Sequence, residues 1–405
     1  MTEANAPPPV DPFFETIHDG QWNACVGVQG DEQNYVDGYI EAALELASAV
    51  IDKRLVASRD TLAMPILYNG RHALELSLKF AINRLHSMGA IKSTHVPNHD
   101  ILSHWVHLRD AGVGDVALRQ LIADLEPYVV SLAKIDDDGQ ELRYPTNRDG
   151  KKSLDTVAVV NLPHIRKSLE VMSGILTRLK YRIIDLADER GTGSYTKGCS
   201  REDLQSIARM LGDYSTWTES SFDNRKAAVR EKFGLSSNKF SDAVNQIRGS
   251  RPLAALIGIE TQLTYLTDEK AVFAIEEWIK AYPPRVHNPE DLGTDYFDRD
   301  WDKVVEHQRV TKELINAIME NLSDEELSDL EVLYYIGRGG EFGEHYDAML
   351  ADTLAKHKLA KSRWDGVYHI MTKANLVDNV IIGSRAVGRP SLADKLQAIL
   401  PAIPA

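Results

Sequence analysis

A row of charged residues lies on a helical pattern in the first third of the chain. Arg71, Glu75 and Lys79 are spaced four residues apart, and on a helix this spacing places them one turn apart on one face. We therefore expect Glu75 to form ion pairs with both neighbours, and His72 lies beside the row. Two uses remain open: a structural ion row between helices, or an anion or nucleotide contact made by Arg71, His72 and Lys79.

Histidines are frequent between residues 86 and 107, just after this row. Asp100, His104 and His107 would share one helix face, and a carboxylate with two imidazoles can hold a metal ion. One helix rarely supplies a complete site, so we predict no metal. Exposed positions are expected for His104 and His107, and helix capping for His99.

A second group of candidate residues lies in the segment RGGEFGEH at 338–345. A metal-independent ribonuclease needs a base for the 2′-hydroxyl proton and a cation for the charge that develops on phosphorus. His345 and Arg338 are residues of these two types. The glycines between them favour a turn between two helices, so an active-site pair and a plain turn both stay open. No strand precedes the segment and no P-loop lysine follows it, which excludes a P-loop.

Positive charge is unevenly distributed along the chain. Lys and Arg outnumber Asp and Glu within 190–260 and within 351–395, although the whole chain has a net charge of −14. Such a net charge argues against a nucleic-acid surface that covers the entire protein. Local contacts with phosphates remain compatible with it.

Two short helical patterns meet at a turn between residues 233 and 240, with the spacing of a helix-turn-helix. Lysine and arginine in the second pattern can contact phosphates, and asparagine and glutamine can read base edges. DNA contact by 236–251 is therefore one hypothesis, and ordinary solvated helix faces are the other. The candidate residues are Lys239, Asn245, Gln246, Arg248 and Arg251.

The elements that must position all these residues are helices. Apolar residues recur at three- and four-residue spacing and predict helices over about 35–55, 62–86, 100–110 and 118–132. The second of these is apolar on most sides, which indicates a central helix. Four helices with short connections predict a four-helix bundle. The longest pattern, 163–190, predicts a helix of about 40 Å that closes it.

The remaining sequence divides the chain into four parts. We expect a disordered leader over 1–30, a helical bundle over 31–190, a small helical domain over 199–285 and a C-terminal domain of short helices over 295–405. The glycine-rich segment 191–198 marks a boundary. Capping boxes are predicted at Ser200 with Asp203 and at Ser323 with Glu326. No alternating run is long enough to predict a strand, so the predicted fold is all-α.

Composition restricts the class of protein. The chain has 405 residues, of which 43% are hydrophobic and 26% charged, values that are ordinary for a globular protein of two or three domains. Its two cysteines form no zinc pattern and no disulfide framework, so we expect a cytoplasmic protein. No apolar run reaches the length of a membrane span. Nothing in the sequence indicates a cofactor.

Three segments in order resemble a known superfamily: RHALELSLK at 71–79, HDILSHW at 99–105 and LRYP at 142–145. They resemble the HEPN (higher eukaryotes and prokaryotes nucleotide-binding) superfamily over about 35–150. The resemblance implies a four- to five-helix bundle, often a homodimer, that binds nucleotide or RNA in a bacterial defence, stress or toxin–antitoxin locus. Under this interpretation the candidate binding residues are Arg71, His72, Glu75, Lys79, His99, Arg143 and Tyr144.

Active members of that superfamily are metal-independent ribonucleases with an arginine and a histidine separated by four to six residues on a late helix of the bundle. The comparable region here holds Arg143 and Arg148, but no histidine before His164. The resemblance therefore favours binding over cleavage. A ribonuclease that uses Arg338 and His345 is the alternative hypothesis. A helical scaffold for protein partners or a DNA-binding regulator is the second alternative.

Overall fold

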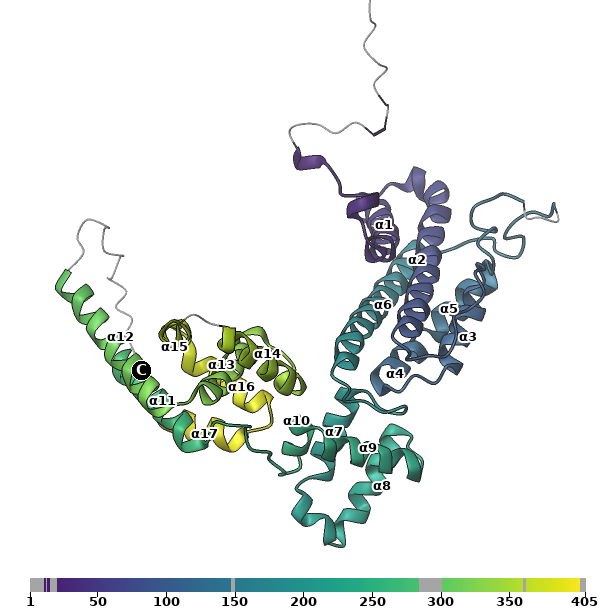
Figure 1. The fold of residues 1–405 in the computed structure, drawn as a ribbon. Helices are drawn as coiled ribbons and strands as arrows, with labels where there is room; N and C mark the ends of the chain where they lie inside the picture. Colours follow the sequence, from purple (N-terminus) through teal and green to yellow (C-terminus); the bar gives the residue numbers. More distant parts are fainter. Residues whose placement is uncertain are drawn as a thin grey trace, which may run out of the picture. The chain divides into compact units, whose positions relative to one another are not determined.

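The computed structural model of this chain describes residues 11, 13–14, 20–146, 150–283, 301–359 and 362–400. Helices form nearly all of the regular structure in these residues, and they contain no strand (Figure 1). The all-α prediction is confirmed. Most of the predicted leader lies outside the described residues. Two short 3-10 turns within it, Gly20–Trp22 and Gly27–Gln29, have no buried residue.

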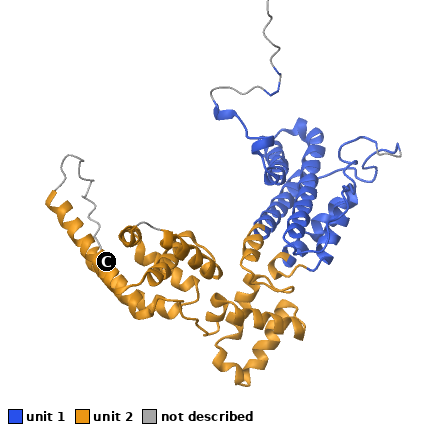
Figure 2. Ribbon diagram, viewed as in Figure 1, with its two compact units in different colours: residues 1–112, 119–183 blue, residues 113–118, 184–405 orange. Residues whose placement is uncertain are grey.

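The chain forms two compact units, coloured separately in Figure 2. Unit 1 comprises residues 1–112 and 119–183, and unit 2 comprises residues 113–118 and 184–405. The division falls inside the long helix predicted over 163–190, a few residues before the expected domain boundary.

The central element of unit 1 is α2, as its apolar pattern predicted. Buried residues lie on most sides of this helix, and α1 and α3 both pack against it (Figure 1). The long helix predicted over 163–190 is confirmed as α6. The helices of this part of the chain are α1 (Glu32–Asp52), α2 (Arg59–Ser87), α3 (Ile101–Asp110), α4 (Val116–Asp124), α5 (Glu126–Ile135) and α6 (Leu162–Gly191).

Local sequence explains where these helices begin and end. The Asp100 carboxylate accepts a hydrogen bond from the Ser103 amide and caps α3. The capping role expected for His99 was wrong, because its ring contacts Glu75 instead. One prediction was wrong: the helix expected over 118–132 is two helices, which meet at Leu125. Pro127, in the first turn of α5, has no amide hydrogen to donate to a carbonyl of α4, and this interrupts the helix.

Unit 2 contains two hydrophobic cores, each enclosed by its own helices. The first is formed by α7 (Arg201–Leu211), α8 (Ser221–Phe233), α9 (Ser237–Gly249) and α10 (Arg251–Ala255). The second is formed by α11 (Asp268–Ala281), α12 (Trp301–Asn321), α13 (Asp324–Gly339), α14 (Tyr346–Leu359), α15 (Arg363–Met371), α16 (Leu376–Ala386) and α17 (Pro390–Ala398). We expected α11 within the small domain ending at 285, but Ala271, Ala274 and Ile275 bury their side chains in the second core.

Turns and caps in unit 2 follow the sequence closely. Both predicted capping boxes are present, Ser200 with Asp203 and Ser323 with Glu326. Gly234, with φ of 66°, ends α8 in the left-handed conformation, which glycine adopts without steric cost. A turn of residues 234–236 then leads into α9, so the predicted succession of helix, turn and helix is confirmed.

Candidate functional site

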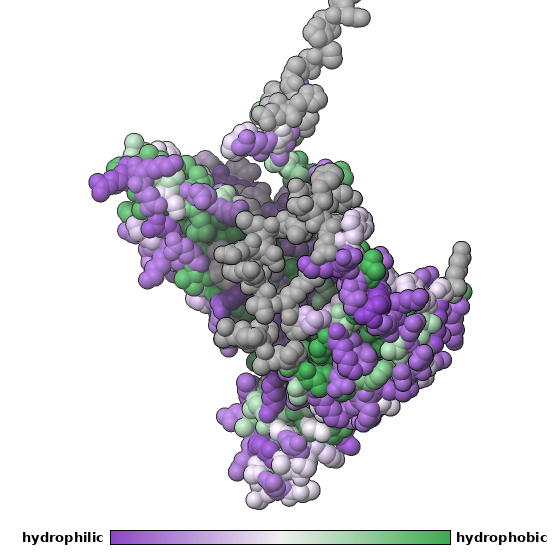
Figure 3. Space-filling view, turned by 90° about the vertical axis from the view of Figure 1, so that its left-hand side faces the viewer, coloured by the Kyte–Doolittle hydropathy of each residue, from purple (hydrophilic) through white to green (hydrophobic). Residues whose placement is uncertain are grey.

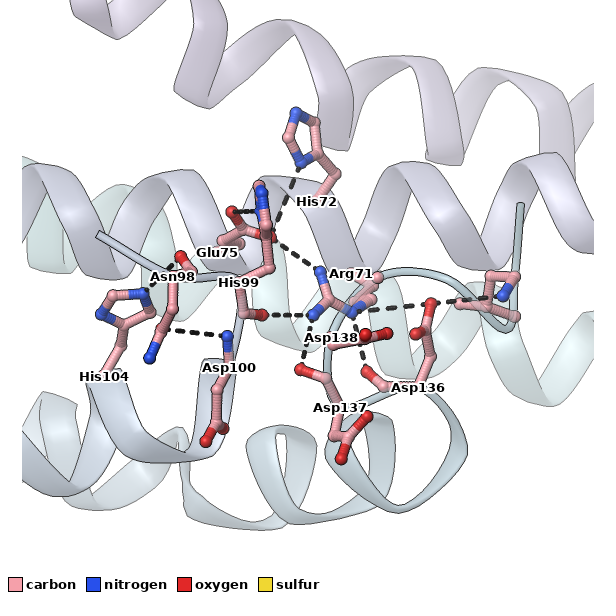
Figure 4. A network of polar contacts seen from close by, with 12 residues as sticks. Arg71, His72, Glu75, Asn98, His99, Asp100, His104, Asp136, Asp137 and Asp138 are labelled. Carbon is pink, nitrogen blue, oxygen red and sulfur yellow. Dashed lines mark hydrogen bonds and ion pairs between the residues drawn. The ribbon is translucent and has the colours of Figure 1, made fainter. Parts of the chain in front are cut away.

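Arg71 is a charged residue in the interior of unit 1, with 1% of its surface exposed. Its Nη1 donates a hydrogen bond of 2.8 Å to Glu75 Oε2. Nε donates to the carbonyl of Asp136 at 2.8 Å, and Nη2 to those of His99 at 2.6 Å and Asp137 at 2.9 Å (Figure 4). The guanidinium therefore connects α2, the segment before α3 and the loop that follows α5.

The loop after α5 is shaped around this guanidinium. The Asp136 carboxylate accepts hydrogen bonds from the amides of Glu141 and Leu142 and closes the loop on itself. A Cβ atom at Gly139, where φ is 78°, would lie 3.2 Å from Arg71 Nη1. Arg71 thus directs its donors into the protein, and this geometry favours the structural use of Arg71 over a ligand contact.

Glu75 accepts hydrogen bonds from three side chains, although only 1% of it is exposed. Lys79 Nζ lies 2.6 Å and His99 Nδ1 2.8 Å from Oε1, while Arg71 occupies Oε2. The predicted pairs with Arg71 and Lys79 are confirmed. Burial raises the pKa of Glu75, but the hydrogen bonds from Lys79, Arg71 and His99 outweigh it and bring the pKa to about 2. Glu75 is therefore ionised at neutral pH, but a carboxylate with so low a pKa is a weak base, and its oxygens are already occupied by three donors.

His72 lies at the edge of this cluster, partly exposed and surrounded by aromatic rings. Its Nδ1 is 4.0 Å from Glu75 Oε2. The imidazole stacks on the Tyr68 ring at 5.6 Å and meets the Tyr39 ring edge-on at 4.4 Å between centroids. Burial lowers the pKa of His72 below its ordinary value, more than the attraction of Glu75 raises it. His72 is thus neutral at pH 7 and presents a flat ring.

Arg143 and Tyr144 extend the aromatic surroundings of His72 to the exterior. The Arg143 guanidinium lies 5.6 Å from the Tyr68 ring centroid and 5.5 Å from that of Tyr144, and its Nε donates to the carbonyl of Gly139. Both residues are exposed, Tyr144 to 52%. We call the group formed by Tyr39, Tyr68, His72, Arg143 and Tyr144 the Tyr68 surface.

Sequence reasoning missed three residues of this region. Tyr68 is four residues before His72, so the helical spacing that paired Arg71 with Glu75 also signals this contact. Tyr39, on α1, and Asp136, in the loop after α5, carry no such signal because their partners lie on other elements.

The predicted ribonuclease pair lies in unit 2 at a turn. Arg338 is exposed in the last turn of α13, which ends at Gly340 with φ of 64°. His345 is half-buried in the 3-10 turn Gly343–His345, where its ring faces Phe342 at 6.1 Å. Arg338 lines a cavity of about 510 Å³ whose described lining residues do not include His345. This cavity therefore does not bring the two side chains together in the described part of the chain, which favours a turn between two helices over an active-site pair.

The histidine group before and on α3 differs from expectation. His104 is 1% exposed, so its predicted surface position was wrong. Its Nε2 lies 3.1 Å from the Asn98 carbonyl (Figure 4), and the His95 ring lies 4.5 Å from its ring and 5.1 Å from that of His107. Asp100 is engaged as the cap of α3. Within the described residues, no three His, Cys, Asp or Glu side chains are arranged to hold a metal ion.

Most of the polar residues proposed for DNA contact have partners within unit 2. Gln246 Nε2 donates to the Gly193 carbonyl at 3.1 Å. Arg251 Nη1 donates to two backbone carbonyls, of Thr261 at 2.9 Å and of Gln262 at 2.7 Å. The Arg248 guanidinium lies 5.2 Å from the Tyr214 ring centroid. These contacts stabilise the fold and favour the interpretation of 236–251 as structural.

None of the helices in the described ranges has the length and apolar character that a membrane crossing requires.

Comparison of this chain with protein-family models, curated proteins and solved structures finds no match in any of the three.

Proposed function

We propose that unit 1 binds single-stranded RNA or a nucleotide through the Tyr68 surface, as a HEPN-like protein that does not cleave its ligand. The observation that carries this proposal is the exposed guanidinium of Arg143 between the rings of Tyr68 and Tyr144. Unpaired bases stack on aromatic rings and on arginine planes, and cations beside the rings attract the phosphates.

The buried cluster supports this use because it holds the surface in place. Arg71 binds the carbonyls of Asp136 and Asp137 at the start of the loop that carries Arg143 and Tyr144. A binding surface that is ordered before the ligand arrives loses less conformational entropy on binding. Lys79, whose side chain is 29% exposed, supplies a second positive charge near the cluster.

The chemistry of the same residues favours binding over cleavage. Ribonuclease chemistry without a metal needs a base and an acid of suitable pKa beside the 2′-hydroxyl. Glu75 is buried and bound by three side chains. His72 is neutral, but no arginine precedes it with four to six residues between them, the arrangement that active members of the superfamily carry.

The proposal is tested by fluorescence anisotropy with a labelled single-stranded RNA of twelve nucleotides at low salt. Because stacking contributes about 1–3 kcal/mol per base, Tyr144→Ala is expected to weaken binding about 5- to 150-fold. Tyr181→Ala is the matched control, since Tyr181 is also exposed (54%) and lies 4.9 Å from a cation, Lys180 Nζ, on α6. Absence of RNA binding by the unaltered protein, or equal losses in both variants, would contradict the proposal.

A further inference from the structure

Unit 2 contains a cavity of about 1280 Å³ bordered by α11, α12, α15 and α16. This volume exceeds the roughly 300–1,000 Å³ of ordinary small-molecule sites, so a ligand the size of a nucleotide fits within it with water. Five aromatic or imidazole side chains line it: Trp278, Tyr282, His307, Trp364 and Tyr368. On the face seen in Figure 3, hydrophobic residues form separate patches in a largely hydrophilic surface.

The aromatic walls come in pairs of stacked or tilted rings. Trp364 and Tyr368, one turn apart on α15, stack with centroids 4.9 Å apart and planes inclined by 17°. They are 38% and 44% exposed. Trp278 and Tyr282, one turn apart at the end of α11, have centroids 5.3 Å apart. Large rings left partly exposed around a cavity are typical of a binding site rather than of a core.

The polar groups around these rings favour an anion. Among the described lining residues, the lysines and carboxylates are Lys312, Lys373 and Asp378. Two positive charges against one negative charge give the cavity an excess of positive charge. The buried Nε1 of Trp278 finds no hydrogen-bond acceptor in the described part of the chain. A buried donor without an acceptor destabilises the free protein, and a ligand that supplies an acceptor removes this cost.

We propose that this cavity binds a nucleotide: a planar heteroaromatic base held by the aromatic rings and a phosphate attracted by Lys312 and Lys373. A quaternary ammonium ion also binds aromatic cages, but two lysines repel it. The site is built from residues of unit 2 alone, and it does not rest on the function proposed for unit 1.

The test is isothermal titration of the full chain with each of the four nucleoside monophosphates, with adenosine, with inorganic phosphate and with tetramethylammonium. At least one monophosphate is expected to bind. Trp364→Ala is expected to weaken it about fivefold or more, as loss of a stacking ring does. In the double variant Lys312→Ala/Lys373→Ala, the monophosphate should bind no more tightly than its nucleoside, because the phosphate has lost both lysines.

Controls separate this site from other surfaces. Trp301→Ala removes a tryptophan of unit 2 that is 69% exposed and is not among the cavity's lining residues, and it should leave binding unchanged. Tyr144→Ala should also leave nucleotide binding by the cavity unchanged, although it weakens RNA binding by unit 1. Tyr368→Leu provides a second cavity variant, and circular dichroism confirms that each variant is folded. The proposal is overturned if no monophosphate binds, if Trp364→Ala and Tyr368→Leu have no effect, or if tetramethylammonium binds as well as a nucleotide.

Discussion

Arg71 shows how one side chain can connect segments that are distant in sequence. Its guanidinium is buried and donates hydrogen bonds to a carboxylate on its own helix and to carbonyls of two other segments. Removal of one partner of a buried ion pair leaves the other charge uncompensated, which costs about 3–5 kcal/mol. Arg71→Met is therefore expected to destabilise unit 1 by that amount, measured from the urea dependence of hydrogen exchange in α2.

Arg59→Met is the control for this prediction because Arg59 lies on the same helix and pairs with Asp60 on the surface. Its side chain is 61% exposed, and exposed pairs contribute about 0–1 kcal/mol. Equal losses for the two variants would show that the Arg71 cluster adds no more to stability than a surface pair.

Glu75 makes the stability of the same cluster depend on pH. Its pKa of about 2 in the folded protein lies below the ordinary value of 4.5. The ionised carboxylate therefore stabilises the fold by about 3 kcal/mol above pH 4.5, and this contribution is lost as pH falls from 4.5 toward 2. Glu75→Gln should be less stable than the unaltered protein at pH 7, with a difference that shrinks at pH 3. Hydrogen exchange of α2 amides at both pH values measures this difference in stability. A stability difference that is the same at pH 7 and pH 3 would contradict the prediction.

The residues of the candidate site could be predicted only where helix geometry encodes the contact. The i, i+4 pairs of Glu75 with Arg71 and Lys79 followed from spacing. The carbonyl of Asp136, 65 positions from Arg71, could not be found in this way, because loop closure places it there. The burial of His104 was predictable after all, since it is three residues after Ile101 and four before Leu108, which are both buried.

At the scale of elements, caps and periodicity predicted most helices, while their association was harder to predict. Both predicted capping boxes rest on contacts within four residues of sequence, and they are present. The place of α11 in the second core depends on contacts with α12 and α17, which helical periodicity does not specify. Periodicity shows which face of a helix is buried, but not which helix covers it.

The packing of α13 against α16 depends on two glycines and leads to an element-scale prediction. A Cβ atom at Gly337 would overlap the Asn379 carbonyl, and one at Gly383 would overlap the Leu333 carbonyl. Gly383→Ala is therefore expected to force these helices apart and to destabilise unit 2 by at least 1–3 kcal/mol, the usual cost of overpacking a core. Hydrogen exchange of α13 peptides in urea measures the loss.

Gly366→Ala, in α15, is the matched control for this prediction. No atom lies within 4 Å of a Cβ built at Gly366, and alanine is the better helix former by roughly 0.5–1 kcal/mol. We expect this variant to be as stable as the unaltered protein or slightly more stable. A tolerated Gly383→Ala, with unchanged exchange in α13, would show that the two helices have room to separate.

For the whole molecule, the net charge of −14 limits how a polyanion can bind. A chain with this charge repels RNA except where cations gather, and the Tyr68 surface with its surroundings offers two, Lys79 and Arg143. For single strands, the logarithm of the binding constant falls with the logarithm of salt concentration with a slope of about −0.7 per phosphate neutralised. Two such contacts predict a slope of about −1.4, measured by RNA titration from 50 to 300 mM salt. Arg143→Ala should reduce it to about −0.7. Because binding through the basic stretch 190–260 would engage several phosphates, a slope steeper than about −3 that Arg143→Ala does not change would place the RNA on unit 2 instead.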